Sequence, residues 1–162
     1  MKAAQLLQAL DSHSSVSVAE SLTGGLLAAA IVDVPGASNV FRGGVCTYAI
    51  DTKTSVLKVP AELLEEEGAV NEETAILMAA GVCDLFDSQW GISTTGVAGP
   101  GPQAGPRGEI AAGTALYAVY HQPTGKHWVR SAVFPGSRQQ VRQQVVEAAL
   151  TLALQAVSAQ PR

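Results

Sequence analysis

Two hydrophobic periods run through this chain and predict that helices and strands alternate along it. Apolar residues recur every three or four positions over 2–11, as on one face of a helix, whereas 15–19 alternates apolar and polar residues, as in a half-buried strand. Further helices are predicted at 23–33, 51–57, 60–68, 72–87 and 137–156. Further strands are predicted at 41–50, 90–94, 110–121 and 127–134.

Residues that favour helix ends set several of these boundaries. Asp51 can cap the helix that ends near 57, and Asn71 can cap the helix that follows it at 72. Ser137 and Gln140 have the spacing of a capping box at the start of the last helix. The residues expected on the buried face of the helix at 72–87 are Ile76, Leu77, Ala80, Val82, Cys83 and Leu85.

The order of these elements predicts an α/β fold. Strands alternate with helices over the first two thirds of the chain, and two strands form a β-hairpin before the C-terminal helix. We therefore expect a single domain over 1–162, a three-layer-like arrangement in which helices cover a mixed β-sheet. The loop at 96–108 is rich in glycine and proline, and its length indicates that it is functional or mobile.

Composition excludes some classes of function. The chain is 47% hydrophobic, which is enough for a full core without disulfides, and 15% of its residues are charged. The net charge of -4 argues against direct nucleic-acid binding, which needs a basic face. Because the low charge and the many alanines and valines leave apolar surface to cover, a homo-oligomer is expected.

The N-terminal segment and the cysteines predict a cytoplasmic protein. The N-terminal residues contain no long apolar region and no cleavage signature, and no apolar run approaches the length that spans a membrane. Cys46 and Cys83 lie in apolar segments without a C-x-x-C partner. Both are expected to be buried free thiols in a reducing compartment.

Polar residues and glycines gather where the first strand gives way to the second helix. Ser21, Thr23, Gly24 and Gly25 lie there. The first amides of a helix lack partners within the helix and attract anions, and glycines let a ligand approach the backbone closely. Each glycine also weakens a helix by about 1 kcal/mol relative to alanine, so the pair indicates either a binding site or tight helix packing.

Ser21 is a candidate nucleophile if a base lies near it. A serine hydroxyl reacts weakly until a base takes its proton, and a lysine can be that base when burial keeps it neutral. Lys53 lies between apolar segments, which favours partial burial, and Tyr48 could relay a proton. The alternative is a solvated helix lysine and a tyrosine at a strand end. No Ser-His-Asp set is visible, since the three histidines are expected at the surface: His13, His121 and His127.

A second candidate site follows the strand at 90–94. The strand runs into a loop of small residues that includes Thr95, Gly96, Ala98 and Gly99, and the amides of such a loop could hold a phosphate. The alternative is a plain surface loop. A dinucleotide fingerprint is excluded, because prolines interrupt the helix that it requires.

Two arginines form a third candidate site. Arg138 and Arg142 lie four positions apart and therefore on one face of the last helix. They could clamp a phosphate or a carboxylate, or they could simply face solvent. The carboxylates and histidines of the chain have no metal-ligand spacing, so no metal site is expected.

Several separated segments, taken in order over about 5–157, resemble the motifs of the CinA C-terminal domain family, the bacterial nicotinamide mononucleotide deamidases. The likeness is carried by the following segments: Ala19-Glu20-Ser21-Leu22-Thr23-Gly24-Gly25, Gly43-Gly44-Val45-Cys46-Thr47-Tyr48 with Lys53, Gly68-Ala69-Val70-Asn71-Glu72, Thr95-Gly96-Val97-Ala98-Gly99-Pro100, and Phe134-Pro135-Gly136-Ser137-Arg138 with Arg142.

The resemblance implies hydrolysis of the carboxamide of nicotinamide mononucleotide to nicotinate mononucleotide and ammonia, without a metal or another cofactor. It implies Ser21 as the nucleophile, Lys53 as the general base and Tyr48 as an assisting residue. The loop at 95–99 and the two arginines become candidates for binding the ribose and the phosphate. Free amides at the turn 22–25 could stabilise the oxyanion.

The chain departs from the family pattern at positions that bear on the substrate more than on the fold. The family commonly has Tyr-Ser-Asn-Glu-x-Lys where this chain has Tyr48-Ala49-Ile50-Asp51-Thr52-Lys53. Ser137 replaces the aspartate of Gly-Asp-Arg, and the loop at 100–108 also differs. Two alternatives to the deamidase therefore stay open, namely a non-catalytic nucleotide-binding or partner-binding module and an amidase for another small amide.

Overall fold

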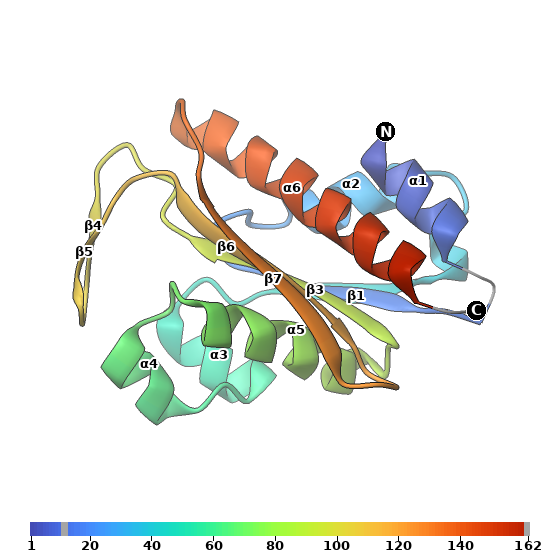
Figure 1. Ribbon diagram of the computed structural model, residues 1–162, viewed down its shortest axis with the longest axis horizontal. Coiled ribbons are helices and arrows are strands. Elements are labelled where there is room, and N and C mark those ends of the chain that lie inside the picture. The colour runs from blue at the N-terminus through green and yellow to red at the C-terminus, as the bar shows by residue number, and fades with distance from the viewer. Residues whose placement is uncertain (11–12, 161–162) are drawn as a thin grey trace.

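One inner strand of the sheet, at Val16–Glu20, is buried at every position and not half-buried as predicted, because helices cover both faces of the sheet. The computed structural model describes residues 1–10 and 13–160 (Figure 1). Strand β1 (Val16–Glu20) lies between β2 (Phe41–Cys46) and β3 (Trp90–Gly96), and both neighbours are parallel to it. Next to β3 come β6 (Thr114–His121) and β7 (Lys126–Val133), each antiparallel to the strand before it.

The order β2-β1-β3-β6-β7 confirms the predicted mixed sheet with a hairpin before the last helix. Because β6 alone runs against the others, β1, β2, β3 and β7 all end at the same edge of the sheet. Ligands of open α/β sheets bind outside the carboxyl ends of the parallel strands. The segments that follow these four strands therefore lie close together at this edge of the sheet.

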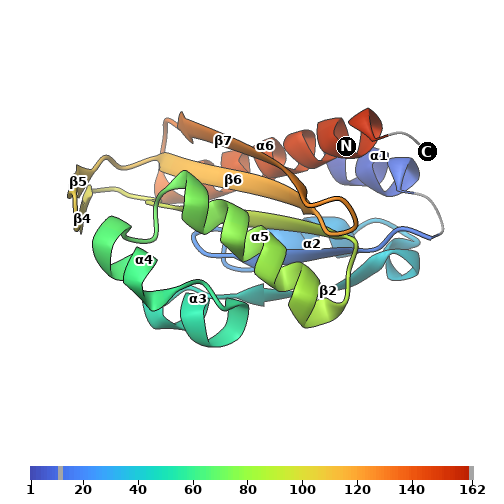
Figure 2. The same cartoon turned by 60° about the horizontal axis from the view of Figure 1, so that its bottom comes forward.

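Helices form a layer on each face of the sheet (Figures 1 and 2). One layer holds α1 (Lys2–Ala9), α2 (Leu26–Val32) and α6 (Arg138–Ala159), and the other holds α3 (Ile50–Leu57), α4 (Ala61–Glu67) and α5 (Glu72–Phe86). A short 3₁₀ helix lies at Ala37–Asn39. Alternate residues of β1 serve the two layers, since Val18 packs with the first and Ala19 with the second.

Helix α5 turns a different face to the sheet from the one predicted. Val82 and Cys83 are buried as expected, but Leu85 is exposed, and Ile76, Leu77 and Ala80 are only partly buried. The helix presents small residues instead, and a Cβ added to Gly91 of β3 would lie 2.1 Å from the carbonyl oxygen of Ala79. Helix α5 itself carries apolar residues on nearly every side. The spacing of these residues along the sequence therefore could not determine which face packs against the sheet.

The capping predictions have mixed outcomes. Asn71 accepts a hydrogen bond from the amide of Thr74, and Ser137 and Gln140 form the predicted capping box. The cap of α3 is instead Ala49, which leaves Asp51 in the first turn. The predicted end of the first helix at 11 lies outside the described residues.

Two further sequence-based expectations, on Cys46 and on the loop at 96–108, are corrected. Cys46 is exposed at the end of the edge strand β2, and only Cys83 is a buried thiol. The loop at 96–108 contains most of a small hairpin, β4 (Gln103–Gly105) and β5 (Gly108–Ile110). Among the described residues, no helix is both long and apolar enough to cross a membrane.

Candidate active site

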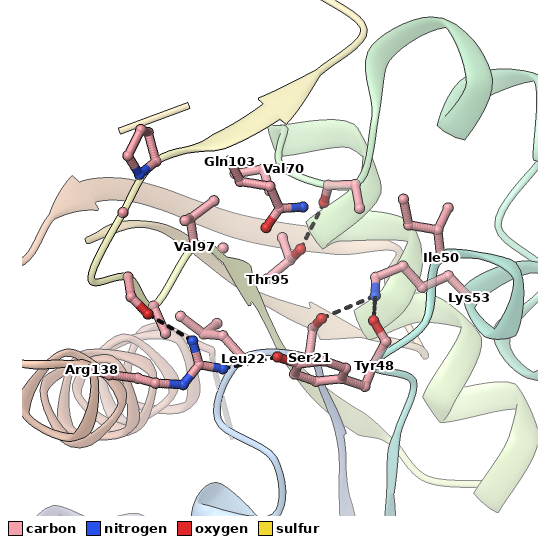
Figure 3. Close-up of a pocket in the computed structure, with 16 residues that line it drawn as sticks. Ser21, Leu22, Tyr48, Ile50, Lys53, Val70, Thr95, Val97, Gln103 and Arg138 are labelled. Carbon is pink, nitrogen blue, oxygen red and sulfur yellow. Dashed lines mark hydrogen bonds between the residues drawn. The ribbon is translucent and has the colours of Figure 1, made fainter. Parts of the chain in front are cut away.

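One pocket of about 260 Å³ opens where β1, β2 and β3 end (Figure 3). This volume is at the small end of the range for small-molecule sites, about 300–1,000 Å³. The pocket brings together eight of the residues singled out from the sequence: Ser21, Tyr48, Lys53, Thr95, Gly96, Ala98, Gly99 and Arg138. It is not lined by Thr23, Gly24, Gly25 or Arg142.

Ser21 and Lys53 are in direct contact at the base of this pocket. The Lys53 Nζ atom lies 3.0 Å from Ser21 Oγ and also donates to the carbonyl oxygens of Thr47 and Tyr48. Ser21 directly follows β1, and Lys53 lies in α3, which follows β2. The parallel pairing of these strands therefore brings together two residues that are 32 positions apart.

Burial changes the chemistry of Lys53. The residue is only 1% exposed, and desolvation lowers the pKa of its amine from 10.5 to about 8. No Asp or Glu pairs with it within the part of the chain that the structure describes. A neutral amine can donate two N–H groups to the carbonyls of Thr47 and Tyr48 and turn its lone pair toward the hydroxyl of Ser21. The geometry thus suits a serine activated by lysine.

Tyr48 and Arg138 form the mouth of the pocket. Tyr48 is 60% exposed, and its hydroxyl accepts a hydrogen bond of 3.0 Å from Arg138. Arg138 also donates to the carbonyl oxygen of Gly99, so the loop after β3 and the start of α6 meet here. No aspartate or glutamate is found among the described lining residues, and the charge at the mouth is therefore positive.

The start of α2 is not the anion site that the sequence suggested. The helix begins at Leu26, so Gly24 and Gly25 precede its first turn, with positive φ angles of 55° and 101°. The amides of Leu27 and Ala28 donate to the carboxylate of Glu20, at 2.9 and 3.1 Å. The first amides of this helix are therefore satisfied from within the protein, by Glu20, for which the sequence predicted no such role.

Arg142 and Thr23 support the turn from outside the pocket. Arg142 donates to the backbone carbonyl oxygens of Leu22 and Thr23, at 2.9 and 3.1 Å. The hydroxyl of Thr23 is buried and lies 2.7 Å from that of Thr94. Arg142 thus holds the backbone next to Ser21, whereas Arg138, one helical turn earlier, faces the pocket.

Sequence reasoning missed Gln103, which lines the pocket from β4, and it gave no site role to Val70, which lines the pocket from the segment before α5. A single glutamine in a loop gives no signal of its own, because only the folded hairpin directs it inward. Thr95 lines the pocket as well, but its hydroxyl donates to the carbonyl oxygen of Ala69. Within residues 1–10 and 13–160, no group of His, Cys, Asp and Glu side chains is placed to hold a metal ion.

Comparison with known proteins places this chain in a family. Residues 1–157 match the CinA C-terminal domain. A CinA-like protein of Frankia casuarinae is 46% identical over 140 residues, which are 86% of this chain and 31% of the relative. A CinA-like protein of Desulfotalea psychrophila is 43% identical over 129 residues, which are 80% of this chain and 30% of the relative.

A solved structure extends the likeness to the fold. Competence damage-inducible protein A of Klebsiella pneumoniae is 29% identical and superimposes with a TM-score of 0.91, covering 99% of this chain and 97% of its own. The curated relatives are longer proteins, and this chain spans about a third of their length.

Proposed function

The chain belongs to the CinA C-terminal domain family, and we propose that it is an amidohydrolase that converts nicotinamide mononucleotide to nicotinate mononucleotide and ammonia. The observation that carries this proposal is the contact of 3.0 Å between Ser21 Oγ and the buried Nζ of Lys53. A buried amine with a lowered pKa beside a hydroxyl is the arrangement that nucleophilic catalysis needs.

In the proposed reaction, neutral Lys53 takes the hydroxyl proton while Ser21 Oγ attacks the carboxamide carbon. Leu22 lines the pocket, and its amide donates to no backbone carbonyl in the part of the chain described, which leaves it for the oxyanion. The Lys53 ammonium then protonates the departing nitrogen, and ammonia leaves an ester on Ser21. Water, deprotonated by Lys53, then attacks the ester carbon. The bond from that carbon to Ser21 Oγ breaks, Lys53 returns the proton to Oγ, and nicotinate mononucleotide leaves as the carboxylate.

The remaining lining residues support an anionic substrate. Arg138 offers a guanidinium at the mouth, where the phosphate of a mononucleotide would lie once the carboxamide is at Ser21. Burial of a lysine without an acidic partner weakens folding, a cost that a module used only for binding has no reason to carry. This favours the enzyme over the binding module.

The test is ammonia release from nicotinamide mononucleotide by the wild type and by Ser21→Ala and Lys53→Ala. We expect turnover by the wild type and its loss in both variants. Ser55→Ala and Lys58→Ala make the same chemical changes outside the pocket, and both should keep full turnover. A folded wild type without turnover, or a Ser21→Ala variant that remains active, would overturn the proposal.

A further inference from the structure

Gln103 enters the pocket from a hairpin that is separate from the main sheet. Strands β4 and β5 pair only with each other, and the hairpin stands at the end of the molecule beside α4 (Figures 1 and 2). Its first residue, Gln103, lines the pocket, and its side-chain amide points inward next to Thr95 and Val70 (Figure 3).

The amide of Gln103 is free to bind a ligand. It makes no hydrogen bond within residues 1–10 and 13–160, and it offers a carbonyl oxygen and two N–H donors. The other polar groups near it are engaged, since Thr95 donates to Ala69 and Arg138 donates to Gly99 and Tyr48. Gln103 is therefore the neutral group of this wall that can both donate and accept.

Three polar groups lie at different places around the pocket. Ser21 and Lys53 lie on one side and Arg138 on another, while Gln103 faces the space between them from the hairpin (Figure 3). A ligand with its carboxamide at Ser21 and its anion at Arg138 presents its middle part to Gln103. In a pyridine mononucleotide, that middle part is the sugar, whose hydroxyls also both donate and accept.

We infer that Gln103 is a specificity-determining residue, which hydrogen-bonds the sugar hydroxyls of a ribose-phosphate substrate. The inference rests on the proposed function for the identity of the substrate. The contact of Gln103 is with the sugar, however, and does not depend on the chemical step at Ser21. A neutral amide can donate a hydrogen bond to a hydroxyl or accept one from it. A charged lysine or arginine at position 103 would instead compete with Arg138 for the phosphate.

The tip of the hairpin is what holds Gln103 over the pocket. Arg107 forms an ion pair with Glu67 at the end of α4. Pro106 packs on Gly68, where an added Cβ would lie 3.0 Å from the proline Cδ. The ion pair is largely exposed and therefore contributes little, so the close contact at Gly68 is the firmer anchor.

The inference is tested by calorimetry in a Ser21→Ala background, where no substrate is consumed. Three probes are titrated, namely nicotinamide mononucleotide, ribose 5-phosphate and nicotinamide, into the parent and into Gln103→Leu. We expect the variant to bind the first two about 3- to 10-fold more weakly, the worth of one or two neutral hydrogen bonds, and nicotinamide equally well. Gln122→Leu, at a surface glutamine that bonds Asp84, is the matched control and should change nothing.

Each outcome separates the inference from the function on which it rests. If Gln103→Leu weakens nicotinamide but not ribose 5-phosphate, the residue contacts the carboxamide and the inference is wrong. It is also wrong if all three affinities stay unchanged. Absence of turnover in the wild type would remove the proposed reaction, yet a selective loss of ribose 5-phosphate affinity would still support the sugar contact. A parent that binds none of the probes would refute the sugar contact, whereas the proposed reaction is decided by turnover of the wild type.

Discussion

The pH dependence of turnover gives the sharpest test of Lys53, because the proposed mechanism uses only its neutral form. The pKa of the buried amine is lowered to about 8 by desolvation, from an ordinary 10.5. At pH 7 this raises the neutral fraction roughly 300-fold, to about one amine in ten. Between pH 7 and pH 9 the neutral fraction rises about tenfold further, and above pH 9 it is nearly complete.

We therefore expect kcat/KM for nicotinamide mononucleotide to rise about tenfold from pH 7 to pH 9 and to level off above. Ammonia release measured from pH 7 upward avoids the titration of the substrate phosphate, whose second pKa is about 6. Tyr48→Phe should keep the same midpoint even if its rate falls, because the tyrosine hydroxyl bonds Arg138 rather than Lys53.

Lys53→Arg is the matched variant for this test. Arginine keeps a positive charge at every accessible pH and cannot serve as a base, so turnover should be lost across the whole range. A profile of the wild type that is flat from pH 7 to pH 9 would refute the reasoning, since a base with a pKa near 8 must titrate there. An active Lys53→Arg would refute it independently.

Three further predictions follow from the same contacts. Between pH 8 and 10.5 the Lys53 amine is protonated in the unfolded chain but largely neutral in the folded protein. The free energy of unfolding, measured by chemical denaturation, should therefore rise over this range by up to about 3 kcal/mol more than in Lys53→Met. Glu20→Gln removes one of the two carboxylate oxygens that cap α2 and should cost about 1–3 kcal/mol in the same assay, and unchanged stability would contradict that role. Arg142→Ala should lower kcat about 10- to 100-fold with little change in KM, whereas Arg138→Ala should raise KM, and a KM effect at Arg142 would instead indicate substrate contact.

Local signals in the sequence were enough for most of the fold. The position of β1 and the caps at Asn71 and Ser137 depend on neighbouring residues, and all three were predicted. The half-burial predicted for β1 was wrong, since both of its faces are covered. The packed face of α5 depends on which strand lies beneath it, and Gly91 provides that contact from another part of the chain. The spacing of apolar residues within α5 does not say which strand packs beneath it.

The candidate site was predicted unevenly for a related reason. Ser21 and Lys53 were paired on the chemistry of an activated serine, and the family resemblance supported the pair, but only the adjacent strands bring them within 3.0 Å. The expectation of a free helix terminus failed because Glu20, next to the proposed nucleophile, already occupies it. Gln103 went unnoticed, since its inward direction is a property of the hairpin and not of the residue.

The occupied helix terminus also determines how charge can be balanced during the proposed reaction. Glu20 offsets the positive end of α2, so this end adds little positive potential for an oxyanion at Ser21. Proton transfer to Lys53, however, creates an ammonium 3.0 Å from the attacking oxygen in the same step. Because no carboxylate lines the described pocket, the new cation finds its counter-charge in the oxyanion itself. Burial that disfavours the ammonium before the reaction therefore strengthens its attraction to the transition state.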